Sequence, residues 1–233
     1  MPPESFRQLT RDQFAQALET FPFTRRIDVV HMHHTWSPDH ADYRGYETIV
    51  GMWRYHTQTN GWSDIAQHAS IAPDGTIWTG RNWNRPPASA SGFNGSTKLG
   101  PFMFETIGNF DVGHDVLDGA QLDAVVEVIA RVQQRFGLPA EALRFHRQMT
   151  DQKSCPGTGV RRDEIIALVE IHALPPIRVL AESGGRRKRG LSFSGATNGD
   201  SQFTNEVVSD LLARARRRAP GESSGEPAEN RPV

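Results

Sequence analysis

Four histidines and one cysteine, in two short segments, are the residues best suited to chemistry. His31, His33 and His34 stand at the end of an apolar, β-branched run, and His146 precedes Cys155 by nine residues. Catalytic zinc takes three protein ligands of nitrogen, sulfur or oxygen type and keeps a further position open. Two histidines and a thiolate meet that need, so the residue types predict a zinc site.

The expected strand around the first three histidines limits which of them act together. Side chains alternate along a strand, so His31 and His33 share one face while His34 points to the other. Geometry therefore leaves His31, His33 or both as ligands, with a hydrogen-bonded core position as the alternative for each. Cys155 is followed by Pro-Gly, which indicates a rigid turn that fixes the direction of the thiol.

Cys155 is the single cysteine of the chain, so no intramolecular disulfide can form. Besides metal ligation, it could be a buried inert thiol or the nucleophile of a cysteine peptidase. A nucleophilic cysteine usually lies at a helix N-terminus, where its pKa is depressed. Cys155 stands before Pro156 and Gly157 instead, and this context favours the ligand interpretation.

Alternating strand-like and helical patterns predict the elements that position these residues. A capping box at Thr10-Arg-Asp-Gln13 opens a short helix, and Pro73-Asp74-Gly75 is the turn of a hairpin. The loop that follows the hairpin is long, and loops of that length are often functional. The predicted strands cover 27–33, 65–72, 76–81 and 102–107, the predicted helices cover 46–59, 118–136 and 161–174, and the long loop covers 82–99. Residues 143–146 form a short apolar segment that leads into the loop with Cys155.

This order of elements predicts an α/β fold in which a mixed central β-sheet is flanked by helices. We divide the chain into an N-terminal helical extension over 1–26, a metal-binding domain over 27–174 and a tail over 175–233. The tail is rich in Pro, Gly, Glu and Ser and is expected to be flexible and disordered. Within it, residues 203–218 have the spacing of an amphipathic helix.

Composition excludes several classes of function. The chain has 233 residues and a formal net charge of −1, so we do not expect nucleic acid as a partner. The basic run at 186–189 is interpreted as part of a solvated tail, with attraction to an anionic polymer as the alternative. No apolar run is long enough for a membrane span, and the N-terminus lacks the pattern of a signal peptide. We therefore expect synthesis in the cytoplasm.

Five blocks of the chain resemble a family of peptidoglycan amidases. This family includes amidase-type phage lysozymes, peptidoglycan recognition proteins and the cytosolic amidase of cell-wall recycling. Its pattern runs from His-His-Thr through Trp-x-Asp-Ile and Asp-Gly-x-Ile-x-x-Gly-Arg to a histidine followed by Cys-Pro-Gly. The matching blocks, in the family's order, are Val30–Thr35, Trp62–His68, Asp74–Arg81, Phe104–Phe110 and His146–Gly157. They span about residues 27–174.

The resemblance implies hydrolysis of the amide bond between N-acetylmuramic acid and L-alanine in peptidoglycan or muropeptides. It implies Zn²⁺ as the cofactor, with His33, His146 and Cys155 as ligands, because the family uses the first histidine of the His-His-Thr block. Residues 27–174 would then form a zinc amidase domain that acts on the cell wall after release or secretion. Some recognition proteins of this fold do not cut peptidoglycan and commonly lack the cysteine ligand, so a non-catalytic binding module is the alternative.

The resemblance also implies catalytic roles. Lys153 occupies the position at which many active relatives carry a lysine, and we assign it to the oxyanion. Phage enzymes place a tyrosine where this chain has Gln67, which cannot titrate. Recycling amidases place a glutamate where Glu105 stands, so we expect Glu105 to act as general base and acid. The alternatives are a structural carboxylate for Glu105 and a solvated loop position for Lys153.

Substrate contacts are expected around the same blocks. For His68, structural hydrogen bonding within the hairpin is the alternative, and for Trp36 it is packing of the loop. The predicted substrate-binding residues are His34, Trp36, Gln67, His68 and Arg81.

Overall fold

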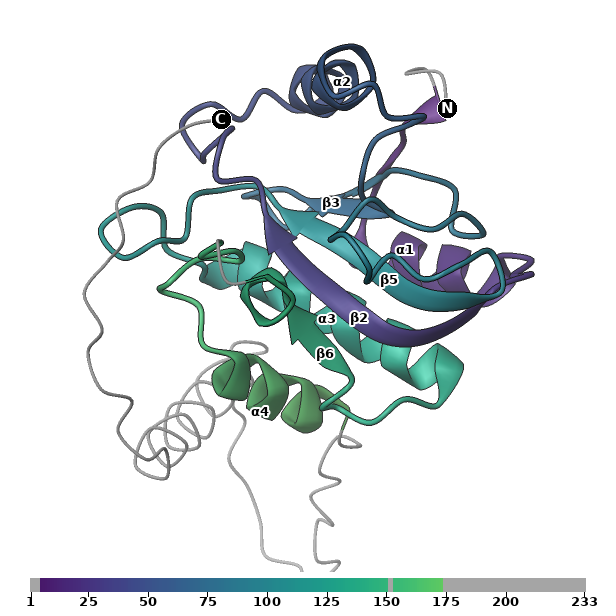
Figure 1. The fold of residues 1–233 in the computed structure, drawn as a ribbon. Helices are drawn as coiled ribbons and strands as arrows, with labels where there is room; N and C mark the ends of the chain where they lie inside the picture. The colour runs from purple at the N-terminus through teal and green to yellow at the C-terminus, as the bar shows by residue number, and fades with distance from the viewer. Residues whose placement is uncertain (1–4, 151–152, 174–233) are drawn as a thin grey trace, which may run out of the picture. The chain divides into compact units, whose positions relative to one another are not determined.

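A single mixed β-sheet organises the part of the chain that the computed structural model describes, residues 5–150 and 153–173 (Figure 1). Its strand order is β1-β4-β3-β5-β2-β6. β2 pairs in parallel with both β5 and β6, and β3 pairs in parallel with β5, whereas β4 is antiparallel to its two neighbours. The strands are β1 Gln8–Leu9, β2 Arg26–His34, β3 Ala69–Ile71, β4 Ile77–Thr79, β5 Leu99–Thr106 and β6 Leu143–Phe145.

Helices pack on this sheet and on one another. α3 contacts β2, β3 and β5 and packs against both α1 and α4. α2 lies at the top of the view in Figure 1, above β3. The predicted α/β class, a mixed sheet flanked by helices, is confirmed. The helices are α1 Arg11–Thr20, α2 Tyr46–Arg54, which continues as a π-helical turn η2 Tyr55–Thr59, α3 Gly119–Phe136, the 3₁₀ turn η3 His146–Gln148 and α4 Arg162–Ala173.

Local signals fixed several of these boundaries correctly. The capping box of α1 is present, with Thr10 and Gln13 exchanging both hydrogen bonds. α3 ends at Gly137, which adopts the left-handed conformation that glycine permits. The predicted tail, including its helix at 203–218 and its basic run, lies outside the described residues.

The predicted hairpin is present, and backbone hydrogen bonds from Gly80 to His68 and from Arg81 to Gln67 extend it beyond its regular ladder. The extended runs over 65–72 and 76–81 form regular ladder pairs only within β3 and β4. At His68 the backbone N–H donates to the Met103 carbonyl oxygen of β5 at 2.9 Å, and the ring Nδ1 accepts the Met103 N–H at 3.0 Å. β1, a two-residue edge strand beside β4, was not predicted.

Alternation along β2 separates the core from the chemistry. Val30 and Met32 are fully buried in the main apolar core, together with residues of α3. His31 and His33 project from the other face, as expected from the period of two. In the described residues, no helix is long and apolar enough to cross a membrane.

Candidate metal centre

The carboxyl ends of three parallel strands bring the predicted ligands together. In the register of the sheet, His33 of β2 lies opposite Glu105 of β5. Met32 lies opposite Phe145, the last residue of β6, so His146 follows directly beside His33. In open α/β sheets, ligands usually bind at this edge.

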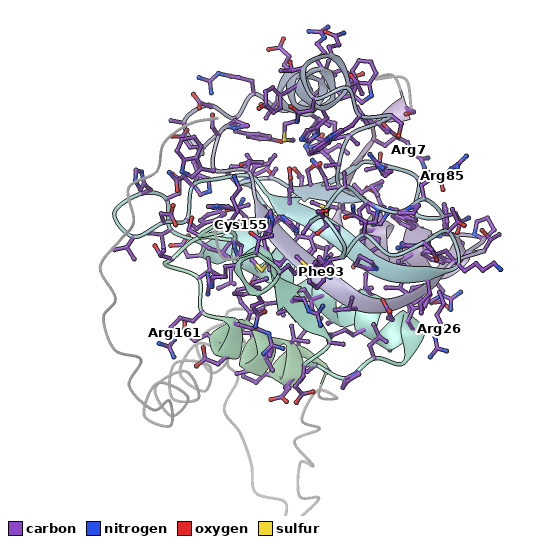
Figure 2. All side chains as sticks on the ribbon, viewed as in Figure 1. Arg7, Arg26, Arg85, Phe93, Cys155 and Arg161 are labelled. Atoms are coloured by element: carbon purple, nitrogen blue, oxygen red, sulfur yellow. The ribbon has the colours of Figure 1, made fainter. Side chains whose placement is uncertain are left out.

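His33, His146 and Cys155 form a compact set of donor atoms. One candidate ligand atom from each lies within 4.8 Å of the other two. The two imidazole rings are 4.5 Å apart between centroids. Cys155 lies beside the end of β2 (Figure 2), where its Sγ accepts the His34 N–H at 3.3 Å. Two imidazoles and one thiol form a ligand set that suits a catalytic zinc ion, which needs one further open position.

Burial keeps these donors uncharged. Desolvation, assisted by the charge of His146, holds the pKa of His33 well below its ordinary value. The pKa of His146 is also lowered, by burial and by the charge of Lys153. Burial and, to a smaller extent, the charge of Glu105 raise the pKa of the Cys155 thiol to about 12. A nucleophilic cysteine needs a depressed pKa, so this environment argues against a cysteine peptidase.

The loop that carries Cys155 is held by hydrogen bonds and by a close backbone approach. The Arg147 guanidinium donates to the carbonyl oxygens of Gly157 and Val160, each at 2.7 Å. Gly157 has φ 114°, and a Cβ there would lie 2.4 Å from the carbonyl oxygen of Phe110. Only glycine fits this position, which explains the Pro-Gly that follows the cysteine.

Glu105 links the donor set to a cleft of about 420 Å³. The cleft is lined by Glu105, by the segment after β2 that includes Thr35, and by residues of α2 and η2 such as Met52 and His56. Burial raises the pKa of Glu105 to about 8. A cation beside it would oppose that shift, because positive charge favours the carboxylate.

The other sequence-predicted residues fall into two groups. Lys153 is exposed, and its charge influences both His146 and Cys155, so it lies beside the donor set. Trp36 is 56% exposed and has φ 59°, an uncommon backbone conformation for a residue with a side chain. Neither residue lines the cleft, and the roles of both stay predictions.

Four predicted substrate contacts lie mostly inside the protein. Gln67 and His68 are fully buried, which corrects the expectation that they contact a substrate. The Gln67 amide donates to Ser70, and the His68 ring bonds the Met103 N–H and the Arg85 carbonyl oxygen. The His34 ring accepts the Phe110 N–H, and Arg81 donates to three backbone carbonyl oxygens, those of Asp64, Ile65 and Pro86.

Sequence reasoning missed Ser89. Its hydroxyl lies 2.7 Å from His33 Nε2 and 3.0 Å from His31 Nδ1, at the back of the donor set. Ser89 is one of three serines in the long loop, with Ser91 and Ser96, and nothing in the sequence distinguishes it from the other two.

The fold, together with His33, His146 and Cys155, defines a class of α/β proteins. Members of this class carry a candidate His-His-Cys metal site at the carboxyl ends of parallel strands. Residues 23–158 match the family model described as N-acetylmuramoyl-L-alanine amidase. The match covers more than half of the chain, and the chain belongs to this family. The resemblance seen in the sequence blocks is therefore confirmed.

Similar proteins include both amidases and recognition proteins. The human N-acetylmuramoyl-L-alanine amidase is 31% identical over 136 residues, which are 56% of this chain and 22% of that protein. The chain thus corresponds to a small part of that relative. Among solved structures, N-acetylmuramoyl-L-alanine amidase LysC from Clostridium intestinale is 25% identical, with a TM-score of 0.51, over 64% of this chain and 87% of that one. A variant of Drosophila PGRP-LB in complex with tracheal cytotoxin is 27% identical, with a TM-score of 0.51, over 66% of this chain and 84% of that one.

The raised pKa of Glu105 predicts that this residue lowers the free energy of unfolding of the metal-free protein in a pH-dependent way. In the unfolded chain this carboxyl loses its proton near its ordinary pKa of 4.5, but in the fold it keeps the proton up to about pH 8. The contribution of Glu105 to stability therefore falls as pH rises through that window. Glu105→Gln should raise the free energy of unfolding by about 4 kcal/mol more at pH 9 than at pH 5, since one pKa unit corresponds to about 1.4 kcal/mol and the folded and unfolded chains differ by one bound proton over about three pH units of this range.

Urea unfolding of metal-stripped protein at the two pH values measures this difference. Glu47→Gln, an exposed glutamate that lines the same cleft, is the matched control and should show no such change. Equal effects of the two substitutions at both pH values would contradict the buried environment assigned to Glu105.

Proposed function

We propose that this chain is a zinc-dependent amidase that hydrolyses the bond between N-acetylmuramic acid and L-alanine in peptidoglycan or muropeptides. The observation that carries the proposal is the convergence of His33, His146 and Cys155 within 4.8 Å, beside a glutamate that opens onto a cleft. Family membership supports the reaction class. The tracheal cytotoxin complex of PGRP-LB supports a muropeptide-like substrate.

The donor chemistry of the site fits zinc. Two neutral imidazoles and a thiol that becomes a thiolate on binding provide three soft or intermediate ligands, so a tetrahedral ion would have its fourth position left for water. Bound there, zinc would supply a nucleophile at neutral pH and polarise the scissile carbonyl. A carboxylate-rich site for magnesium or calcium would look different.

The residues around the three donors would provide proton transfer, oxyanion stabilisation and substrate binding. Glu105, which lines the cleft, would take a proton from the attacking water and pass it to the leaving nitrogen, which is a general base and acid role. Lys153 supplies positive charge near the developing oxyanion. The cleft formed with α2 and η2 would hold the substrate chain, with Trp36 exposed nearby. Action on the cell wall after release or secretion is part of the same proposal.

A non-catalytic binding module is the second candidate. It is favoured by Gln67, which stands where phage enzymes carry a tyrosine and is fully buried here. The presence of Cys155 in the donor set favours the amidase instead, since recognition proteins that do not cut commonly lack this ligand.

Digestion of purified peptidoglycan tests the proposal. Zinc-loaded protein should release new L-alanine amino termini, and both a chelator and Cys155→Ala should abolish the release while circular dichroism shows a folded chain. A folded, zinc-loaded protein that binds peptidoglycan but releases no L-alanine termini would contradict the amidase and favour the binding module.

The role of Lys153 is tested by Lys153→Met. Loss of one oxyanion donor typically lowers kcat by about 100- to 1000-fold, and we expect a fall of that size with KM little changed. Lys98→Met is the matched control, because Lys98 is also exposed but directly precedes β5. Similar kcat values for both variants would remove Lys153 from the catalytic machinery.

A further inference from the structure

Ser89 connects the two histidines of β2 that face the metal centre. Its Oγ lies 2.7 Å from His33 Nε2 and 3.0 Å from His31 Nδ1. His31, His33 and Ser89 are 1%, 3% and 9% exposed, so water competes little for these bonds. The hydroxyl therefore bonds Nε2 of His33, and Nδ1 is the ring nitrogen that remains for a metal.

The number of available protons sets the direction of the hydrogen bonds that link His33, Ser89 and His31. A serine hydroxyl has one hydrogen, so it can donate to only one of the two imidazoles and must accept from the other. If His33 offers Nδ1 to a metal, its proton resides on Nε2 and is donated to Ser89. Ser89 then donates to His31 Nδ1, which places the His31 proton on Nε2. A metal bound through His33 Nε2 would instead remove the hydrogen bond between His33 and Ser89.

The loop that carries Ser89 is built to hold the hydroxyl in place. The Asn94 Oδ1 accepts the backbone N–H groups of Ser89 and Ala90, at 2.7 and 3.1 Å. Farther along, the Phe93 ring lies 5.6 Å from the guanidinium carbon of Arg144 on β6 (Figure 2). The loop thus spans from the hairpin across β2 to the neighbouring strand.

A buried arginine fixes the base of the same loop. Arg25 is 2% exposed and donates to the carbonyl oxygens of Asn94, Ser96 and Pro101, at 3.3, 2.7 and 2.9 Å. A Cβ at Gly100 would lie 2.4 Å from the Arg25 Nη2, so the close approach requires glycine. These contacts leave Ser89 little freedom to move away from the histidines.

We propose that Ser89 is a positioning residue that fixes the ring orientation and tautomer of His33 for zinc binding, with His31 as the terminal acceptor. The inference rests on the zinc site of the proposed function. Groups that orient a metal-bound histidine typically change metal affinity by about 10- to 100-fold when removed. Ser89 would set affinity in this way without touching metal or substrate.

Zinc affinity of the full chain is the test, measured by competition with a chromophoric chelator. Ser89→Ala should bind zinc about 10- to 100-fold more weakly than the wild type. Ser91→Ala, the same change at an exposed position of the same loop, should bind like the wild type. Ser89→Thr, which keeps a hydroxyl, should lie closer to the wild type than Ser89→Ala does.

A second readout needs no variant. Nitrogen-15 spectra of the histidines in the zinc-bound wild type should show both His31 and His33 protonated at Nε2. Equal zinc affinities of Ser89→Ala and Ser91→Ala, or a His33 protonated at Nδ1, would overturn the role of Ser89 while leaving the amidase intact. A folded wild type that binds no zinc would overturn both this role and the proposed function.

Discussion

The parallel pairing of β2 with both β5 and β6 is the constraint on which the candidate site depends. Parallel neighbours end at the same edge of a sheet, so three separate segments deliver His33, Glu105 and His146 to one place. A slip of one residue in β2 would turn His33 into the apolar core and bring Met32 out. The buried alternation of Val30 and Met32 against α3 prevents that slip. The hydrophobic core therefore holds the site in register.

The site brings together ionisable groups whose charged forms are disfavoured by burial. Burial lowers the pKa of His33 and raises those of Glu105 and Cys155, so every shift works against charge. A divalent cation reverses this balance, because thiolate and carboxylate both gain a positive neighbour. The histidines are already in the form that binds a metal, and the thiol is the donor that must release a proton. The arrangement stabilises the fold less than an apolar cluster would, which is typical of sites kept for function.

Much of this could be predicted from the sequence. The strand with alternating histidines, the capped α1, the Gly137 stop of α3 and the order of the blocks all carry local signals that survive in the fold. The contacts made by Gln67, His68 and Arg81 could not be predicted, because burial of their side chains depends on β5 and on the loop at Pro86. Ser89 could not be found for the same reason, since its partners lie more than 50 residues away in sequence. The partners of polar loop residues are set by tertiary contacts, which local sequence patterns do not predict.

The central claim is that His33, His146 and Cys155 bind one zinc ion. X-ray absorption of the zinc-loaded full chain tests it most directly, because sulfur and nitrogen scatterers differ in distance and amplitude. The account predicts one sulfur at about 2.3 Å and two imidazole nitrogens at about 2.0–2.1 Å. The sulfur shell should vanish in Cys155→Ala. A spectrum of the wild type with nitrogen and oxygen scatterers alone would contradict the account.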